Sequence, residues 1–308
     1  MNIALLVNPT AGKGRAAGIV AKVTEALHQC GASVAILVGS DVDEARALAR
    51  QAVDDGVDAV VALGGDGMVH LALNVVAGSA TPLGIIPAGT GNDLANTLGL
   101  PVKEPVAAAR LIGERLQTDG SWPMDAVRVC PDGSQPNGAR PPVWFGCVLG
   151  AGFDSRVNDR ANRMSWPHGR NRYNLAILAE LRVFRPLPFV LELDGERWET
   201  EAMLVAVGNA KSYGAGMKVT PDAEVDDGLV DVQVLGPVSK PEFLKTFPKV
   251  FKGSHVDHPA VTIRRARVVS LSSPGVTAYA DGEYVADLPI VCETVPGAVQ
   301  VLAPKRGT

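Results

Sequence analysis

Three short segments in the first third of the 308-residue chain combine glycine with polar or acidic side chains, and each follows an apolar run. They are Asn8–Gly14, Gly64–Met68 and Ile86–Asp93. Glycine allows a ligand to approach the backbone closely, and N–H groups at the start of a helix favour phosphate. Asp66 is a carboxylate among glycines, so it would act on phosphate through a metal ion or bound water. Together the three segments predict one composite phosphate-binding pocket.

The first and third segments are also open to other interpretations. The first is not a Walker A loop, because Lys13 is followed by Gly14 and not by serine or threonine. Its G-x-G-x-x-A spacing imitates a dinucleotide fingerprint, but it begins five positions after Val7, whereas the dinucleotide turn follows its strand at once. An ordinary glycine-rich loop remains an alternative. Taken alone, Asn92 and Asp93 are equally consistent with a helix cap.

Alternating strands and helices must position these segments. Continuous apolar runs predict four buried strands, and apolar residues at i, i+3 and i+4 predict three helices between them. The strands are Ile3–Val7, Ser33–Val38, Ala59–Leu63 and Leu83–Ile86, and the helices are Arg15–Gln29, Val42–Val53 and Met68–Val76. Asp41 is placed to cap the second helix, with Glu44 as its capping-box partner. This order predicts a parallel sheet with helices on both faces.

After about residue 125 the chain is rich in short β-segments separated by turn residues. They are Val143–Leu149, Phe189–Leu193, Met203–Val207, Leu229–Leu235, Arg267–Leu271 and Val276–Ala280. Asp194-Gly195 and Asp281-Gly282 predict hairpin turns, so we expect an antiparallel sandwich or barrel. Residues 159–184 interrupt it with a helix over Asn174–Val183. The predicted domains are residues 1–125 and 126–295, and the segment 296–308 is expected to return to the first domain.

Composition excludes several classes of protein. The net charge of −4 gives no general nucleic-acid-binding surface. The four cysteines are widely spread, which predicts neither a disulfide framework nor a zinc site, and His255 and His258 are expected to be solvated loop residues. The apolar run that ends at Val7 is too short for a signal peptide, and no apolar run approaches the ~20 residues of a membrane-spanning helix. We expect a cytoplasmic protein.

The three segments, in this order and spacing, resemble the diacylglycerol kinase catalytic family, which includes bacterial lipid kinases and sphingosine kinases. Further motifs of that family follow along nearly the whole chain. They are Met124–Val127, Gly150–Asp154, Gly208–Ala210, Tyr213–Gly216, Pro221–Ala223, Asp226–Asp231 and Asp281–Glu283. The resemblance implies an N-terminal Rossmann-like three-layer α/β domain, akin to NAD kinase and phosphofructokinase, that binds nucleotide. It also implies a C-terminal antiparallel β-sandwich domain that receives the lipid.

The resemblance implies an ATP site built from the three segments, with Ser40 where relatives often have threonine. The implied residues are Asn8, Pro9, Thr10, Ala11, Gly12, Lys13, Ser40, Gly64, Gly65, Asp66, Gly67, Met68, Val69, His70, Thr90, Gly91, Asn92, Asp93 and Asp125. Asp66 would organise a catalytic Mg²⁺ with the phosphates, supported by Asp93 and Asp125. Met68 departs from the family, which usually has a hydroxyl-bearing residue there, so one phosphate contact is expected to be lost.

Two further roles rest on the resemblance. A structural Mg²⁺ is implied at one turn, where Asp227 would give its side chain and Glu224 and Leu229 their backbone carbonyls. The catalytic base is implied to be Glu283, which would accept the proton of the lipid hydroxyl, with Asp281 beside it. From the residues alone, this Asp-Gly-Glu segment is better explained as a hairpin turn followed by a solvent-facing glutamate.

A kinase that acts on a lipid must reach the bilayer surface. Seven arginines and only two acidic residues lie between Ser155 and Pro186, with Met164 and Trp166 among them. Basic residues near an anionic membrane contribute ~1 kcal/mol each, and tryptophan suits the headgroup zone. We therefore expect peripheral contact with the inner face of the membrane through Arg156–Arg185, although a solvated basic segment is the alternative. The sequence leaves the oligomeric state undecided, and a homodimer is one alternative.

The leading hypothesis is an ATP- and Mg²⁺-dependent lipid kinase. It would transfer the γ-phosphate to the hydroxyl of a diacylglycerol-like lipid and give phosphatidic acid. The alternatives are a kinase for a sphingoid base or another lipid, an NAD kinase-like enzyme, a nucleotide-binding regulator without turnover, and an NADP-dependent oxidoreductase. Met68 is the one residue of the motifs that favours the regulator without turnover. The five-position gap between Val7 and Gly12 argues against the oxidoreductase.

Overall fold

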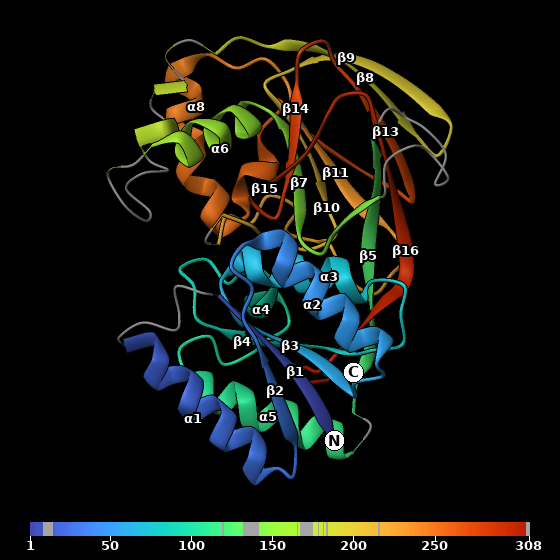
Figure 1. Cartoon of the computed structure of the whole chain (residues 1–308). Coiled ribbons are helices and arrows are strands. Elements are labelled where there is room, and N and C mark those ends of the chain that lie inside the picture. The colour runs from blue at the N-terminus through green and yellow to red at the C-terminus, as the bar shows by residue number, and fades with distance from the viewer. Residues whose placement is uncertain are drawn as a thin grey trace. The chain divides into compact units, whose positions relative to one another are not determined.

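The computed structural model describes residues 1–8, 15–118, 120–131, 142–164, 166, 175–177, 179–180, 182, 184–214 and 216–305. The chain divides into two compact units (Figure 1). Unit 1 comprises Met1–Ala126 and Pro296–Thr308, and unit 2 comprises Val127–Val295. The chain therefore leaves unit 1 once and returns to it at its C-terminal end. Two long strands cross these boundaries, β5 (Trp122–Pro131) and β16 (Ile290–Val301).

The core of unit 1 is a parallel sheet with the strand order β2-β1-β3-β4. The strands are β1 (Asn2–Val7), β2 (Ser33–Leu37), β3 (Ala59–Gly64) and β4 (Leu83–Pro87), each within one residue of its predicted bounds. β3 and β4 are buried along their whole length, as continuous apolar runs require. The end of β16 extends this sheet, because Val301 pairs in parallel with Leu83.

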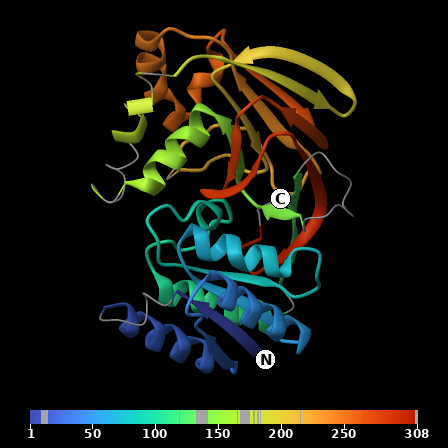
Figure 2. The same cartoon turned by 45° about the horizontal axis from the view of Figure 1, so that its top comes forward.

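Helices cover both faces of this sheet, as Figures 1 and 2 show. They are α1 (Arg15–Gln29), α2 (Val42–Asp54), α3 (Asp66–Val76), α4 (Asp93–Thr97) and α5 (Pro105–Gln117). α1 packs against α5, and α2 packs against α3. The prediction for the first helix is confirmed at both ends. α3 begins two residues before its predicted start, which places Asp66 in the helix.

Unit 2 is a β-sandwich, which confirms the predicted architecture. One sheet is wholly antiparallel, in the order β12-β11-β10-β7-β14-β15. The other joins β16 to β13, β8 and β9, with β5 and β6 paired beside β16. The bounds are β6 (Val143–Phe145), β7 (Val148–Gly152), β8 (Leu187–Leu193), β9 (Glu196–Ala202), β10 (Leu204–Gly208), β11 (Val230–Leu235), β12 (Val261–Ala266), β13 (Val268–Ser272), β14 (Thr277–Ala280) and β15 (Glu283–Asp287). Apolar side chains from both sheets form one core.

Both predicted Asp-Gly hairpins are present. Asp194 and Asp281 have φ angles of 50° and 52°, and the glycines that follow them have φ angles of 91° and 89°. Two successive residues with positive φ define the tight turn that matches the twist of paired strands. These turns join β8 to β9 and β14 to β15.

Several elements of unit 2 differ from the prediction. The single strand expected over Val143–Leu149 is two strands that part at Gly146 and Cys147. The segment after β7 is a helix, α6 (Phe153–Arg163), and further helices are α8 (Lys240–Thr246), η2 (Phe247–Lys252) and η3 (Ser254–Asp257). The helix predicted over Asn174–Val183 lies partly outside the described residues. Among the helices that the structure describes, none combines the length and the apolar character needed to cross a membrane.

Candidate active site

Asp66 joins the second and third glycine-rich segments. It begins α3 at the end of β3, and its carboxylate is bound by the loop that follows β4. Oδ1 accepts a hydrogen bond from the N–H of Asp93 (2.7 Å), and Oδ2 accepts one from the N–H of Asn92 (3.0 Å). Bonds from backbone N–H groups favour the ionised carboxylate, so the loop holds a negative charge at this edge of the sheet.

Glycine is required where the two segments meet. A Cβ atom on Gly89 would lie 2.4 Å from the Cα of Gly65, and one on Gly91 would lie 2.4 Å from Oδ2 of Asp66. Real Cβ atoms do not approach that closely, so a side chain at Gly89 would drive the two backbone segments apart, and one at Gly91 would displace the carboxylate of Asp66. The N–H of Ala88 also donates to the carbonyl of Gly64 (2.8 Å). The sequence therefore predicted correctly that these two segments lie together.

The carboxylates of Asp66 and Asp93 lie against the same stretch of backbone. The position that a Cβ on Gly91 would take is 2.4 Å from Oδ2 of Asp66 and 3.5 Å from Oδ2 of Asp93. Asp93 is also buried. Two carboxylates placed together are the hard oxygen donors that Mg²⁺ prefers. This donor set fits a divalent cation that binds phosphate oxygens at the same time.

The side chain of Asn92 holds its own loop in shape. Asn92 adopts a left-handed conformation, with φ of 54°, which asparagine tolerates better than most residues. Its Oδ1 accepts the N–H of Gly89 (3.0 Å), and its Nδ2 donates to the carbonyl of Gly89 (3.0 Å). Both ends of the amide are therefore engaged within the loop. The backbone N–H of Asn92 is engaged as well, since it donates to Oδ2 of Asp66, and the ligand contact predicted for Asn92 stays a prediction.

The other predicted residues of these segments lie on α3 and in the loop after β4. Gly67 is exposed in the first turn of α3, and Met68 packs so closely that a Cβ on Gly64 would be 2.8 Å from its Cβ. Val69 is buried, and the carbonyl of His70 accepts from Asn74 Nδ2 (2.9 Å). Thr90 is exposed, beside Gly91.

The first predicted segment lies mostly outside the described residues. Asn8 is exposed at the end of β1, and the structure does not describe 9–14, which include Pro9, Thr10, Ala11, Gly12 and Lys13. Nothing in the described residues tests the phosphate contact predicted for this loop.

Ser40 forms two hydrogen bonds with a neighbouring glutamate. Its N–H and its hydroxyl both donate to Oε2 of Glu44, at 2.6 and 2.5 Å. These two hydrogen bonds lower the pKa of Glu44. Asp41 caps α2 as predicted, since its Oδ1 accepts the N–H of Glu44 (2.9 Å). The prediction that Glu44 completes a capping box with Asp41 is wrong, because its carboxylate turns to Ser40.

Asp125 ties the two ends of unit 1 together. It is buried on β5, and its Oδ1 accepts the N–H of Gly297 on β16 (2.8 Å). Gly297 has a φ of 64°, and a Cβ there would lie 3.2 Å from Cβ of Pro123. The carboxylate thus secures the strand on which the chain re-enters this unit. Its predicted support of the nucleotide site stays a prediction.

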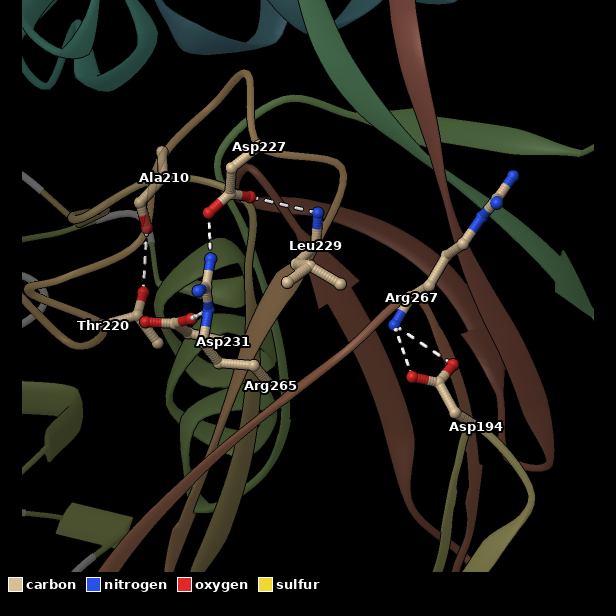
Figure 3. Close-up of polar contacts among 8 residues, drawn as sticks. All are labelled: Asp194, Ala210, Thr220, Asp227, Leu229, Asp231, Arg265 and Arg267. Carbon is tan, nitrogen blue, oxygen red and sulfur yellow. Dashed lines mark hydrogen bonds and ion pairs between the residues drawn. The ribbon is translucent and has the colours of Figure 1, made fainter.

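In unit 2, the carboxylate of Asp281 accepts three backbone hydrogen bonds. The donors are the N–H groups of Gly146 (2.9 Å), Cys147 (3.0 Å) and Val148 (3.2 Å). These N–H groups cannot pair across the sheet in the same way, which explains why the predicted strand parts there. Asp194 makes the same kind of contact in the other Asp-Gly hairpin, where its carboxylate accepts hydrogen bonds from the N–H groups of Arg267 and Val268. Figure 3 shows the bonds from Arg267. Asp281 is therefore a positioning residue for the hairpin.

Glu283 begins β15, one residue after that turn, and it is exposed. It pairs in register with Ala280, so the hairpin fixes its backbone while its side chain stays open to solvent. An exposed carboxylate on a fixed backbone is able to accept a proton from a bound hydroxyl. The position is compatible with the predicted base and with the plain hairpin interpretation alike.

The turn predicted to hold a structural metal is neutralised by an arginine (Figure 3). Oδ1 of Asp227 accepts the N–H of Leu229 (3.1 Å), and Oδ2 pairs with the guanidinium of Arg265. Nε of Arg265 also donates to Asp231 (3.2 Å). Burial raises the pKa of Asp231, and Arg265 opposes that shift. In this arrangement the carboxylate of Asp227 does not fit a metal ion, because the guanidinium of Arg265 already occupies the place of the cation.

Glu224 also has a cationic partner in this turn, since it pairs with Lys211 (2.9 Å). Its predicted role used the backbone carbonyl, which this contact does not involve. Within the described residues, no group of three or more His, Cys, Asp or Glu side chains is arranged to hold a metal. The structural Mg²⁺ stays a prediction, and no function below depends on it.

Two contributors to these sites carried no sequence signal. The N–H groups of Gly146–Val148 become partners of Asp281 only when segments more than 130 positions apart meet in the fold. Arg265 lies in a small basic cluster that is typical of a strand rim. Neither contact follows from local spacing, because both depend on strand order.

The fold and these sites together define a class of protein. Glycine-rich loops and an acid stand at the carboxyl ends of parallel strands, where open α/β sheets bind ligands. An antiparallel sandwich with an Asp-Gly-Glu hairpin follows. This is the architecture of kinases with an NAD kinase-like fold.

Comparison with known proteins agrees with that class. Residues 2–121 match the family model described as "Diacylglycerol kinase catalytic domain", and residues 147–303 match "YegS C-terminal NAD kinase beta sandwich-like domain". A diacylglycerol kinase of Mycobacterium tuberculosis is 46% identical over 99% of this chain and 96% of its own length. A crystal structure of a diacylglycerol kinase from Bacillus anthracis superposes with a TM-score of 0.72 at 22% identity, covering 98% of this chain and 97% of that one.

An NAD kinase from Archaeoglobus fulgidus shares the fold more distantly, with a TM-score of 0.54 at 13% identity, covering 98% of this chain and 93% of that one. The chain belongs to the diacylglycerol kinase family. It is therefore a kinase, with the α/β and β-sandwich architecture that the resemblance implied.

Proposed function

We propose that this kinase transfers the γ-phosphate of ATP to the hydroxyl of a diacylglycerol-like lipid and yields phosphatidic acid, in a Mg²⁺-dependent reaction. The observation that carries the proposal is the placement of Asp66. Its carboxylate is held by two backbone N–H groups, beside Asp93, where two glycine-rich loops meet at closely packed glycines. Phosphoryl transfer needs mainly such positioning and charge stabilisation.

Membership of a kinase family implies ATP as the phosphate donor. In the proposal the glycine-rich loops bring backbone N–H groups close to its phosphates, as their missing side chains allow. Asp66 and Asp93 would hold the Mg²⁺ ion, which neutralises phosphate charge when it is bound. The N–H groups of Asn92 and Asp93 keep the Asp66 carboxylate in one orientation, so its position costs no reorganisation during the reaction.

In the acceptor half of the reaction, Glu283 is proposed to accept the proton of the lipid hydroxyl. Asp281 fixes the hairpin that carries it, through three backbone hydrogen bonds. The contribution of Glu283 would depend on a hydroxyl brought within hydrogen-bond distance of its carboxylate.

The acceptor is proposed from the relatives. The 46% identical protein is named a diacylglycerol kinase, and other relatives are named as lipid kinases. A lipid acceptor requires contact with a membrane surface, which we assign to the arginine-rich stretch within Arg156–Arg185 of a cytoplasmic enzyme. Arg170 and Arg172 of this stretch lie outside the described residues.

The test measures transfer of labelled γ-phosphate to mixed-micelle diacylglycerol, sphingoid base and phosphatidylglycerol, with NAD as a parallel acceptor. We expect label in phosphatidic acid, no transfer without Mg²⁺, and a loss of at least 100-fold in Asp66→Asn and in Glu283→Gln. Glu201→Gln is the matched control, because this exposed glutamate lies on β9, away from the hairpin.

Each other outcome would change the assignment. Label in another lipid would keep the kinase and replace the acceptor, and label in NAD would support an NAD kinase-like activity. Unchanged transfer in Asp66→Asn would refute the proposed site. ATP binding without transfer to any acceptor would support the regulator.

A further inference from the structure

A pocket in unit 2 has no part in the proposed phosphate transfer, although Arg156 and Arg163, which line it, belong to the stretch that we assign to membrane contact. It lies between α6 and the β14–β15 hairpin, two elements that pack against one another (Figure 1). Its volume is about 350 Å³, which lies within the range of small-molecule sites. Among its lining side chains are Arg156, Asp159 and Arg163 from α6, and Thr277, Tyr279 and Tyr284 from the hairpin.

The polar face of α6 follows from its sequence. Arg156, Asp159 and Arg163 recur at helical spacing and so share one face, which lines the pocket. On another face, Phe153 and Val157 enter an apolar cluster with Phe184 of the following segment. The helix is thus anchored on one side and presents guanidinium groups on the other.

Three of the lining side chains hold one another. Oδ1 of Asp159 accepts from Nε of Arg163 (3.0 Å) and from the hydroxyl of Tyr279 (3.4 Å). Burial, followed by the charge of Asp159, raises the pKa of Tyr279, so its hydroxyl keeps its proton. These contacts balance the charge of Asp159 with that of Arg163.

Two exposed donors of the pocket have no acceptor among the residues that the structure describes. The guanidinium of Arg156 lies over the ring of Phe184, at 5.6 Å, and none of the carboxylates that the structure describes pairs with it. Tyr284 lies edge-on to Tyr279, with 6.0 Å between the ring centres. In the described part of the chain, its hydroxyl has no hydrogen-bond partner. The pocket therefore carries a net positive charge and unused N–H and O–H donors.

We propose that this pocket binds a phosphate ester. The planar guanidinium of Arg156 matches two oxygens of a phosphate, and the hydroxyl of Tyr284 is available to donate to a third. A phosphate would also offset the net positive charge of Arg156, Asp159 and Arg163 together. The ligand is a lipid headgroup phosphate or a soluble phosphate ester, since both carry the same group.

The two sources are separated by calorimetric titration of the full-length protein, without ATP or Mg²⁺. The probes are dihexanoyl phosphatidylglycerol below its micelle concentration, glycerol 3-phosphate, and dihexanoylglycerol, which lacks phosphate. We expect a phosphate-bearing probe to bind, with affinity 10–100-fold weaker in Arg156→Gln, as for loss of a charged hydrogen bond. Tyr284→Phe should weaken it about 3–10-fold, as for loss of a neutral one.

Matched variants make the outcome decisive. Arg197→Gln removes another exposed arginine, which pairs with Glu199 on β9, and this variant should bind as the wild type does. Glu283→Gln should also bind normally, which separates this pocket from the proposed catalytic base. Tyr284→Phe alters one exposed oxygen, so it tests the proposal even if Arg156→Gln is unstable.

Binding of the lipid probe alone would identify a headgroup as the ligand, and binding of both phosphate probes would include soluble esters. Three results would overturn the proposal. They are no binding of either phosphate probe, binding of dihexanoylglycerol that Arg156→Gln weakens as much as binding of the phosphate probes, and binding of the phosphate probes that neither variant weakens.

Discussion

The carboxylate of Asp281 lies 3.0 Å from the backbone nitrogen of Cys147, 134 positions away in the sequence, and accepts its hydrogen bond. The same carboxylate accepts from Gly146 and Val148. One side chain therefore fixes the end of the β14–β15 hairpin to the break between β6 and β7. Glu283, two residues further on, has a different environment, because it is exposed. The structure thus separates two acids that the Asp-Gly-Glu motif places together.

That separation predicts opposite effects of two substitutions. Asp281→Ala leaves three N–H groups without their acceptor and should cost about 3 kcal/mol of unfolding free energy. This corresponds to a fall of roughly 6–12 °C in Tm for a unit of this size. Glu283→Gln removes no described hydrogen bond, so its Tm should stay within about 2 °C of the wild type. Differential scanning calorimetry and the transfer assay would measure both effects.

Asp194→Ala is the control for the Asp281 substitution, because Asp194 binds the backbone of β13 in the same manner. It should lower Tm to a similar extent while transfer per folded molecule stays normal. A Tm for Asp281→Ala equal to that of the wild type would contradict the positioning role. A large Tm loss in Glu283→Gln would show that this residue is structural instead.

The contact between Gly65 and Gly89 predicts a steric effect at the proposed nucleotide site. In Gly89→Ala, the added Cβ would lie 2.4 Å from the Cα of Gly65, so the backbone must move. Such overpacking typically costs about 1–3 kcal/mol. We also expect weaker ATP binding, because the displaced loop carries the N–H groups that hold Asp66. Thermal unfolding and equilibrium ATP titration would test the two parts.

Gly18→Ala is the matched control for Gly89→Ala. Gly18 lies within α1, and a Cβ there has no heavy atom within 4 Å. The substitution should stabilise the helix by roughly 0.5–1 kcal/mol and leave ATP binding unchanged. Equal effects of the two substitutions would rule out a specific role for the contact between the loops.

Local sequence predicted unit 1 far better than unit 2, for a physical reason. Buried parallel strands such as β3 are continuous apolar runs, and the helices between them keep a regular apolar spacing. β9 instead alternates exposed and half-buried residues, and the prediction included the hairpin turn before it but no bounds for the strand itself. In the candidate site, the glycines and Asp66 could be recognised from the local sequence alone. The partners of Asp281 and Asp227 could not, since strand order supplies them.

The ion pairs of Arg265 predict how the Asp227 turn responds to metal. Arg265 pairs with both Asp227 and Asp231, so the wild type should gain little Tm from added Mg²⁺ and lose little to a chelator. Arg265→Gln leaves two neighbouring carboxylates without that cation. Its Tm should fall, and millimolar Mg²⁺ should restore part of the loss by binding the folded state. Thermal unfolding across a Mg²⁺ series would measure this.

Arg264→Gln is the control for that series, because Arg264 is the neighbouring strand residue and pairs with Glu196 instead. It should show no dependence on Mg²⁺. A strong fall in the Tm of the wild type on chelation would contradict the expectation, and would show that a metal ion is bound at rest.

His255 was expected to be a solvated loop residue, and that prediction is wrong. It is buried, and its Nε2 lies 2.7 Å from Oε1 of Gln233 and 3.2 Å from the carbonyl of Val219. Both partners are acceptors, so Nε2 carries the hydrogen. Among the described residues, Nδ1 has no partner. A second proton there would be buried without an acceptor.

This environment predicts a specific dependence of stability on pH. Burial lowers the pKa of His255 from its ordinary value of 6.5, although the Val219 carbonyl and the charge of Asp257 act in the opposite direction. Below about pH 6.5 the unfolded chain binds a proton that the folded protein excludes. The unfolding free energy contributed by His255 is therefore present at higher pH and falls as pH decreases, by at most about 1.4 kcal/mol per unit.

Comparison with His255→Gln isolates this contribution from the other titrating groups. The variant should be less stable than the wild type at pH 7.5, and the difference should narrow between pH 6.5 and 5. His28→Gln, at an exposed position at the end of α1, should follow the wild type throughout. Chemical denaturation over this pH range gives the required free energies. A difference between wild type and His255→Gln that stays constant with pH would show that His255 does not remain neutral in the folded protein.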